Sequence, residues 1–168
     1  IQWNHQFTLP NNGIGELLET NYFLDYQGVR FIALNSNVMI NEQMEWLETV
    51  LKNNPHKWTI AFFHHPLYSA TTKRDYPERR KRWKPLFDKY GVDLVLQGHD
   101  HAYARGSESL YEKNLITGTN VKDATGTVYV VSVSGPKHYD AKPNWDDYEP
   151  TRYKAGENKQ LFQVISID

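Results

Sequence analysis

The sequence predicts an α/β fold built on parallel strands. Two short and largely apolar runs, Trp58 to Phe63 and Asp93 to Gln97, have the length of buried strands. A helical pattern lies between them, from about Tyr76 to Tyr90. A strand, a helix and a second strand in this order form a βαβ unit, whose two strands are parallel.

The first elements are two short strands, at residues 21–27 and 29–35, which are rich in aromatic and β-branched residues. Gly28 separates them and permits a tight connection. After a loop, apolar residues recur at helical spacing and predict a helix that extends to about Asn53, with Asn41 as its N-cap.

The strand from Trp58 to Phe63 ends at His64-His65-Pro66, because proline cannot continue a central strand. In the helix that follows, Pro85 interrupts the apolar stripe and predicts a kink or a break. Gly91 is a natural residue to end that helix, because glycine readily adopts the left-handed backbone conformation.

The C-terminal part of the sequence is less regular. Beyond Arg105 the pattern is broken until two further strand candidates, Thr127 to Ser134 and Leu161 to Ile167. The stretch between these candidates, from Pro136 to Asn158, is long, polar and aromatic. It predicts a loop at the surface or at an active site.

Composition excludes several classes of protein. The 168 residues have a formal net charge of −1, contain no cysteine and are 39% hydrophobic. No apolar stretch approaches the roughly 18 residues of a membrane span, and a chain without cysteine is not a disulfide-stapled protein. We expect one globular domain or a large part of one, with no membrane partner and no nucleic-acid partner.

One segment is strongly basic. Seven lysine and arginine residues lie between Lys73 and Lys84, against two acidic residues. Such a run is typical of a solvated helix face, and the alternative is a surface that attracts a phosphate-bearing substrate. In the second interpretation Lys73 and Arg74 lie beside the substrate, whereas Arg79 to Arg82 point to solvent.

Three histidines are expected to converge. His64 follows one strand of the βαβ unit and His99 follows the other. The carboxyl ends of parallel strands lie at the same edge of a sheet, where open α/β proteins bind their ligands. His101 shares one side of an extended segment with His99, and Tyr103 and Arg105 continue that side. Three imidazoles at a sheet edge suit a transition metal, unless each is a hydrogen-bonded loop residue.

The other histidines carry weaker signals. His65 is expected to point away from His64, either in a structural role or in support of a metal ligand. His138 follows the third buried strand and is either structural or a proton donor or acceptor. His5 and His56 lie far from the strand ends and are expected to be structural or exposed.

Two segments, Phe62 to Ser69 and Tyr90 to Arg105, resemble the second half of a calcineurin-like metallophosphoesterase, closest to the purple acid phosphatase-like branch. The specific signals are a Gly-His-x-His box after a buried strand and a His-x-Pro box one βαβ unit upstream. The resemblance extends over about residues 20–136. It implies a layered α/β/β/α sandwich, of which residues 1–168 are the C-terminal half only.

The resemblance implies two metal ions, each Fe, Zn or Mn. It makes His64 and His99 ligands of one ion and His101 a ligand of the other. The family's remaining ligands come from an Asp-x-His box, a Gly-Asp box and an Asn-His box, and this sequence contains no Asp-x-His, no Gly-Asp and no Gly-Asn-His. We therefore expect a partner, the missing N-terminal half of the same domain; the alternative is a remnant that no longer binds two metals.

The implied function is hydrolysis of phosphate esters by a binuclear metal centre, in an extracytoplasmic protein. His65 and His138 are the local candidates for catalysis, and Lys73, Arg74 and Tyr103 are the candidates for substrate binding. Three histidines without carboxylates still suffice for one metal. The alternatives are therefore a metal-binding fragment without activity and a non-catalytic interaction domain.

Overall fold

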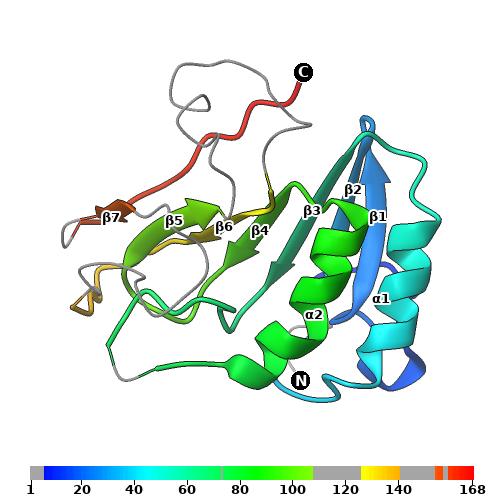
Figure 1. The fold of residues 1–168 in the computed structure, drawn as a ribbon, viewed down its shortest axis with the longest axis horizontal. Coiled ribbons are helices and arrows are strands. Elements are labelled where there is room, and N and C mark those ends of the chain that lie inside the picture. The colour runs from blue at the N-terminus through cyan, green and yellow to red at the C-terminus, as the bar shows by residue number, and fades with distance from the viewer. Residues whose placement is uncertain (1–5, 73, 108–125, 141–153, 157–158) are drawn as a thin grey trace.

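The computed structural model describes residues 6–72, 74–107, 126–140, 154–156 and 159–168, and it confirms the α/β class (Figure 1). Its strands form one seven-stranded sheet in the order β1-β2-β3-β4-β6-β5-β7. The strands are β1 (Tyr22–Tyr26), β2 (Val29–Ala33), β3 (Trp58–Phe63), β4 (Leu94–Gln97), β5 (Tyr103–Ser107), β6 (Val128–Val131) and β7 (Lys154–Gly156). The helices are the short 3-10 helix η2 (Gly15–Leu17), α1 (Gln43–Lys52) and α2 (Pro77–Tyr90).

The centre of the sheet is parallel. β2 pairs with β3, β3 with β4 and β4 with β6, all in the same direction, while β1, β5 and β7 pair antiparallel. The predicted βαβ unit is therefore present as β3-α2-β4. Its register places Phe63 opposite Gln97, so both strands end at the same edge of the sheet (Figure 1).

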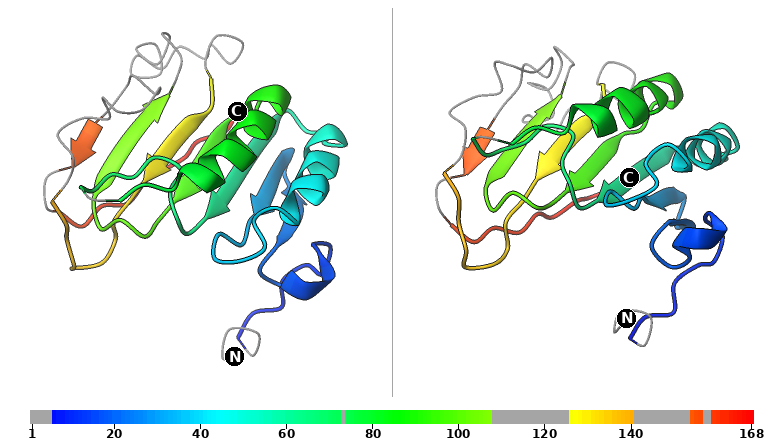
Figure 2. Two further views of the ribbon diagram at one scale, coloured as in Figure 1. Left: turned by 60° about the horizontal axis from the view of Figure 1, so that its bottom comes forward. Right: turned by 90° about the horizontal axis from the view of Figure 1, so that it is seen from below.

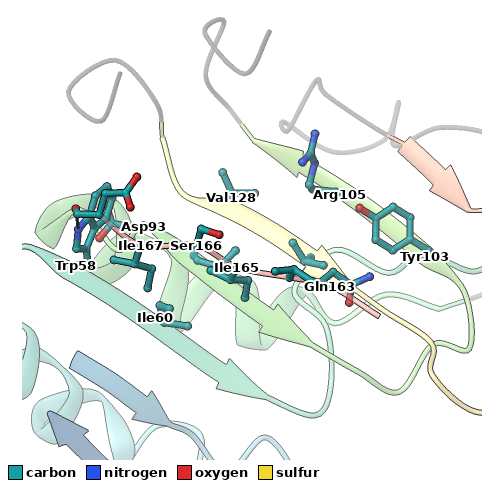
Figure 3. Close-up of a pocket in the computed structure, with 14 residues that line it drawn as sticks. Trp58, Ile60, Asp93, Tyr103, Arg105, Val128, Gln163, Ile165, Ser166 and Ile167 are labelled. Atoms are coloured by element: carbon teal, nitrogen blue, oxygen red, sulfur yellow. Dashed lines mark hydrogen bonds between the residues drawn. The ribbon is translucent and has the colours of Figure 1, made fainter. Parts of the chain in front are cut away.

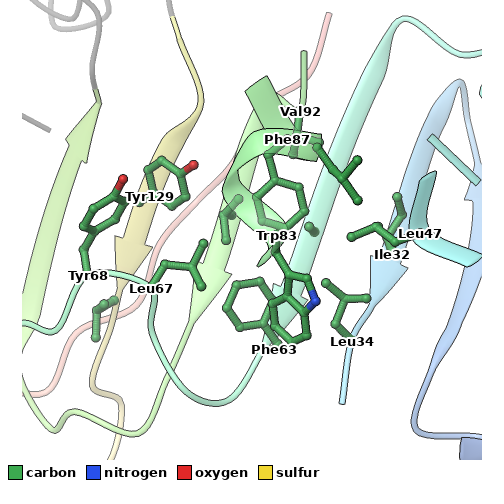
Figure 4. Packing of buried hydrophobic residues seen from close by; sticks show 14 of the residues in the cluster. Ile32, Leu34, Leu47, Phe63, Leu67, Tyr68, Trp83, Phe87, Val92 and Tyr129 are labelled. Atoms are coloured by element: carbon green, nitrogen blue, oxygen red, sulfur yellow. The ribbon is translucent and has the colours of Figure 1, made fainter. Parts of the chain in front are cut away.

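Both long helices cover one face of the sheet (Figures 1 and 2). Trp83 and Phe87 of α2 are fully buried, and the ring of Trp83 meets that of Phe63 edge-on at 4.9 Å between centroids (Figure 4). Leu47 of α1 is equally buried over β2. The described residues thus supply one helical layer and one sheet layer of the expected sandwich. None of the described helices has the length and apolar character of a membrane span.

The opposite face of the sheet carries the end of the chain. Residues 163–168 lie across β3, β4 and β6 and line an open cavity of about 410 Å³ with them (Figure 3). The prediction of a strand from Leu161 to Ile167 is wrong, because this segment crosses the sheet instead of pairing along an edge strand. Isolated hydrogen bonds connect this segment to the rest of the chain: the Leu161 N–H donates to the Val133 carbonyl, and the Trp58 indole N–H donates to the Asp168 carbonyl.

Three local expectations need correction. α1 begins at Gln43, and Glu42, not Asn41, occupies the N-cap position. Of the kink or break predicted at Pro85, the break is absent: α2 is continuous from Pro77 to Tyr90, and buried residues around the proline hold the helix against the sheet. β5 carries little strand signal of its own, with Gly106 inside it, and it becomes a strand through its pairing with β6. Gly91 does end α2 in the left-handed conformation, at φ 63°.

Candidate metal centre

The carboxyl ends of β3 and β4 bring two imidazoles into contact. His64 directly follows β3, and His99 follows β4 after one glycine. The Nε2 atom of His64 lies 2.9 Å from the Nδ1 atom of His99. The expected convergence of these two histidines at one edge of the sheet is therefore confirmed.

The backbone at this edge is shaped to direct His99 inward. The Gly98 N–H donates to the His64 carbonyl at 3.0 Å, which ties the two strand ends together. His99 itself has a φ of 64°, in the left-handed region that residues other than glycine seldom adopt. Such a conformation persists only where the surrounding structure holds it, and it is concentrated at functional sites.

His65 is the third member of the cluster. Its ring centroid lies 4.9 Å from that of His64 and 4.6 Å from that of His99. Among the described residues these three histidines form a group whose ligand atoms all lie within 4.8 Å of one another. The expectation that His65 points away from His64 is wrong, because the strand ends at Phe63 and the alternation of an extended chain ends with it.

His101 takes a different direction from His99. Its Nδ1 atom donates to the Lys137 carbonyl at 3.0 Å, and its ring lies 4.7 Å from that of Tyr139. The turn at His99 rotates the chain, so the two side chains do not share one side of an extended segment as expected. The proposed metal-ligand role of His101 is a separate matter and stays a prediction.

Asp100 anchors the loop between His99 and His101. Its carboxylate is fully buried and accepts hydrogen bonds from the Ser69 hydroxyl at 2.6 Å and the Ala70 N–H at 2.7 Å. The other carboxylate oxygen lies 3.0 Å from the guanidinium of Arg74. Asp100 is thereby satisfied on both oxygens and fixes the loop against the segment that follows β3.

The basic residues are arranged differently from the expectation. Arg74 lies beside the cluster, where its guanidinium also reaches the His99 carbonyl at 3.4 Å. Lys73 lies outside the described residues. Arg79 and Arg80 do not point freely to solvent: Arg79 donates to the Ser36 carbonyl at 2.8 Å and Arg80 to the Leu67 carbonyl at 2.6 Å.

Two further candidates lie apart from the three histidines. Tyr103 lines the cavity on the far face of the sheet, together with Arg105 (Figure 3). His138 lies in the loop whose neighbouring residues, Lys137 and Tyr139, contact His101. The buried Nδ1 atom of His138 has no hydrogen-bond partner among the described residues.

Comparison with known proteins identifies the family of this chain. The sequence model of the calcineurin-like phosphoesterases matches residues 2–103, which is more than half of the chain. The chain belongs to the calcineurin-like phosphoesterase family. Membership in this family implies divalent or trivalent metal ions, and the imidazole cluster is a donor set that suits them.

The similar proteins include purple acid phosphatases, in line with the resemblance stated above. Purple acid phosphatase 15 of Arabidopsis thaliana is 30% identical over 141 residues, which cover 79% of this chain and 25% of that protein. Purple acid phosphatase 18 of the same plant is 26% identical, covering 99% of this chain and 40% of that protein. The purple acid phosphatase PPD1 of yellow lupin superimposes with a TM-score of 0.62 at 25% identity, covering 82% of this chain and 26% of the other. This phosphoesterase chain thus spans less than half the length of these relatives.

Sequence reasoning passed over one signal in this phosphoesterase. The family match starts at residue 2 and includes Asn4-His5, an Asn-His pair without the preceding glycine of the family box. Without that glycine the pair does not match the complete Gly-Asn-His box, which is why the sequence pattern alone predicts only a structural or exposed role for His5. Residues 1–5 lie outside the described part of the chain.

The cluster predicts a pH-dependent stability. Burial, together with the nearby Arg79, His99 and His64, lowers the pKa of His65 to about 4. In the unfolded chain a histidine has a pKa of about 6.5. Between these two values the unfolded state binds the proton and the folded state does not, so stability falls as the pH falls from about 6.5 to about 4.

Urea unfolding of the full-length, chelator-treated protein at several pH values measures this effect. We expect the free energy of unfolding to decline less steeply with falling pH in His65→Gln than in the unsubstituted protein. Identical slopes in the two proteins over this range would show that His65 is not the group responsible.

Proposed function

We propose that this chain forms the C-terminal half of a phosphoesterase domain that hydrolyses phosphate esters at a binuclear metal centre. The observation that carries the proposal is the 2.9 Å approach of His64 Nε2 to His99 Nδ1 at the carboxyl edge of the parallel strands. This separation is close to the roughly 3.3 Å between two nitrogen ligands of one tetrahedral metal ion. The family match and the purple acid phosphatase relatives support the same reaction class.

In this proposal His64 and His99 bind one metal ion and His101 binds the other. Imidazole nitrogen suits Fe, Zn or Mn better than Mg, which prefers oxygen ligands. Paired ions in such a site acidify a water molecule and stabilise charge on the attacking and leaving oxygens of a phosphate ester. The ligands of the Asp-x-His and Gly-Asp boxes come from the N-terminal half of the domain, in agreement with the partial coverage of the relatives.

Within the described part of the chain, we propose that the guanidinium of Arg74 binds the substrate phosphate. Its guanidinium is fixed beside His99 by the buried Asp100, so it is already oriented at the edge where the ester would bind. His138 is the candidate proton donor or acceptor, since its Nδ1 atom has no partner among the described residues and its loop contacts His101. We also propose an extracytoplasmic location, which rests on the resemblance to the purple acid phosphatase-like branch.

Hydrolysis of p-nitrophenyl phosphate by the full-length protein, that is, this chain together with the proposed N-terminal half of the domain, tests this proposal. We expect turnover that is lost on treatment with a strong chelator and restored by Fe, Zn or Mn, because the metals supply the charge stabilisation. Metal binding without turnover would indicate an inactive metal-binding protein. A full-length protein that binds no metal would indicate an interaction domain, and either result would refute the proposal.

A further inference from the structure

We propose that His65 supplies a third nitrogen ligand to the metal position of His64 and His99. This inference rests on the proposed metal centre and goes beyond it, because the resemblance to the family assigns only His64 and His99 to that ion. The sequence pattern gave His65 a catalytic, structural or supporting role. The geometry of the described residues instead points to direct coordination.

The distances suit a shared ion. A tetrahedral zinc ion holds its nitrogen ligands at about 2.0–2.1 Å, which places any two of them about 3.3 Å apart. The ligand atoms of His64, His65 and His99 already lie within 4.8 Å of one another, and the closest pair is at 2.9 Å. The three nitrogens therefore already lie near the spacing that one shared ion requires.

The orientation of His65 is fixed from behind. Its Nδ1 atom lies 3.1 Å from both the carbonyl oxygen and the hydroxyl of Ser36, and its own N–H donates to that hydroxyl at 2.9 Å. Ser36 is buried, with 1% of its surface exposed. A metal-binding histidine typically donates its second ring N–H to a carbonyl, which fixes the tautomer and leaves the other nitrogen for the metal. In His65 this leaves Nε2 as the ligand atom.

The surroundings of the ring favour coordination over proton transfer. The ring of His65 packs against the rings of His99 and Tyr76, whose centroids lie 4.6 and 5.3 Å away. A general acid must reach the leaving group of the substrate with a ring nitrogen. The Nδ1 atom of His65 is hydrogen-bonded to Ser36, and its ring packs against other aromatic rings. His65 is therefore better placed to bind an ion together with His64 and His99 than to transfer a proton to the substrate.

Zinc binding by the full-length protein tests the inference, with His65→Gln as the variant. Chelator competition at one equivalent of zinc should show an affinity at least about 100-fold weaker in His65→Gln, since even an outer partner of a ligand contributes 10–100-fold. His56→Gln is the matched control, because His56 pairs with Asp25 at 3.2 Å and is not part of the cluster. We expect the control to bind zinc as the unsubstituted protein does.

A second measurement does not depend on how the variant folds. In the unsubstituted protein with 15N-labelled histidine, zinc should shift the Nε2 resonance of His65 together with the coordinating nitrogens of His64 and His99. An unshifted His65 resonance, or an unchanged affinity in a folded His65→Gln, would overturn the inference. If zinc binding depends on His65 but the full-length protein has no phosphatase activity, only the proposed function is refuted and the inference stands.

Discussion

Replacing His99 with glycine in the full-length protein is expected to lower the rate of p-nitrophenyl phosphate hydrolysis by at least about a hundredfold. In the proposed centre a metal ion would contribute several kcal/mol of charge stabilisation, and each 1.36 kcal/mol corresponds to about a tenfold change in rate. Glycine is the appropriate replacement because position 99 has a φ of 64°, which glycine adopts without strain. Steady-state kinetics and the metal content of the purified variant measure the effect.

The control is His56→Gln, which removes an imidazole outside the cluster and should leave both quantities unchanged. Thermal unfolding with chelator present separates a lost ligand from a lost fold, since His99→Gly should unfold cooperatively. Full metal content in His99→Gly would contradict the assignment of His99 as a ligand.

Asp100→Ala is expected to cost about 3–5 kcal/mol of unfolding free energy, the range observed when one partner of a buried ion pair is removed. The substitution leaves the Ser69 hydroxyl and the Ala70 N–H buried without their acceptor, and it releases Arg74. Asp100→Asn retains one acceptor oxygen and should lose less. Urea unfolding of the full-length protein at neutral pH, with chelator present, measures both.

Asp88→Ala is the matched control for this prediction. Asp88 is an exposed carboxylate paired with Lys84 one helical turn away, and such surface pairs contribute about 0.3–0.5 kcal/mol. Equal losses in Asp88→Ala and Asp100→Ala would show that the buried network does not stabilise the loop between His99 and His101.

The parallel pairing of β3 with β4 was predictable, because the order of the strands and the helix determines it. Two short apolar runs separated by a helix require a right-handed crossover, and this places His64 and His99 at one edge of the sheet. The prediction needed only the strand lengths and the order of the elements. Gly91 likewise ends α2 because few residues other than glycine adopt a φ of 63°.

The side-chain directions beyond the strand ends were not predictable in the same way. His65 and His101 lie where the chain bends, and contacts from distant segments decide their orientation: Ser36 for His65 and Lys137 for His101. Arg79 points back to Ser36 for the same reason. Residues 161–167 are rich in apolar and β-branched residues, as strands are, but a ladder needs a free edge, and the segment crosses a face of the sheet instead.

The left-handed backbone at His99 places stability and activity in opposition at a single position. A sequence optimised for folding alone would place glycine or asparagine there, because a larger residue in this region costs on the order of 1–3 kcal/mol. The imidazole is retained against that cost. Stabilising substitutions selected without regard to catalysis should therefore accumulate at residue 99 and remove a ligand of the proposed metal centre as they do so.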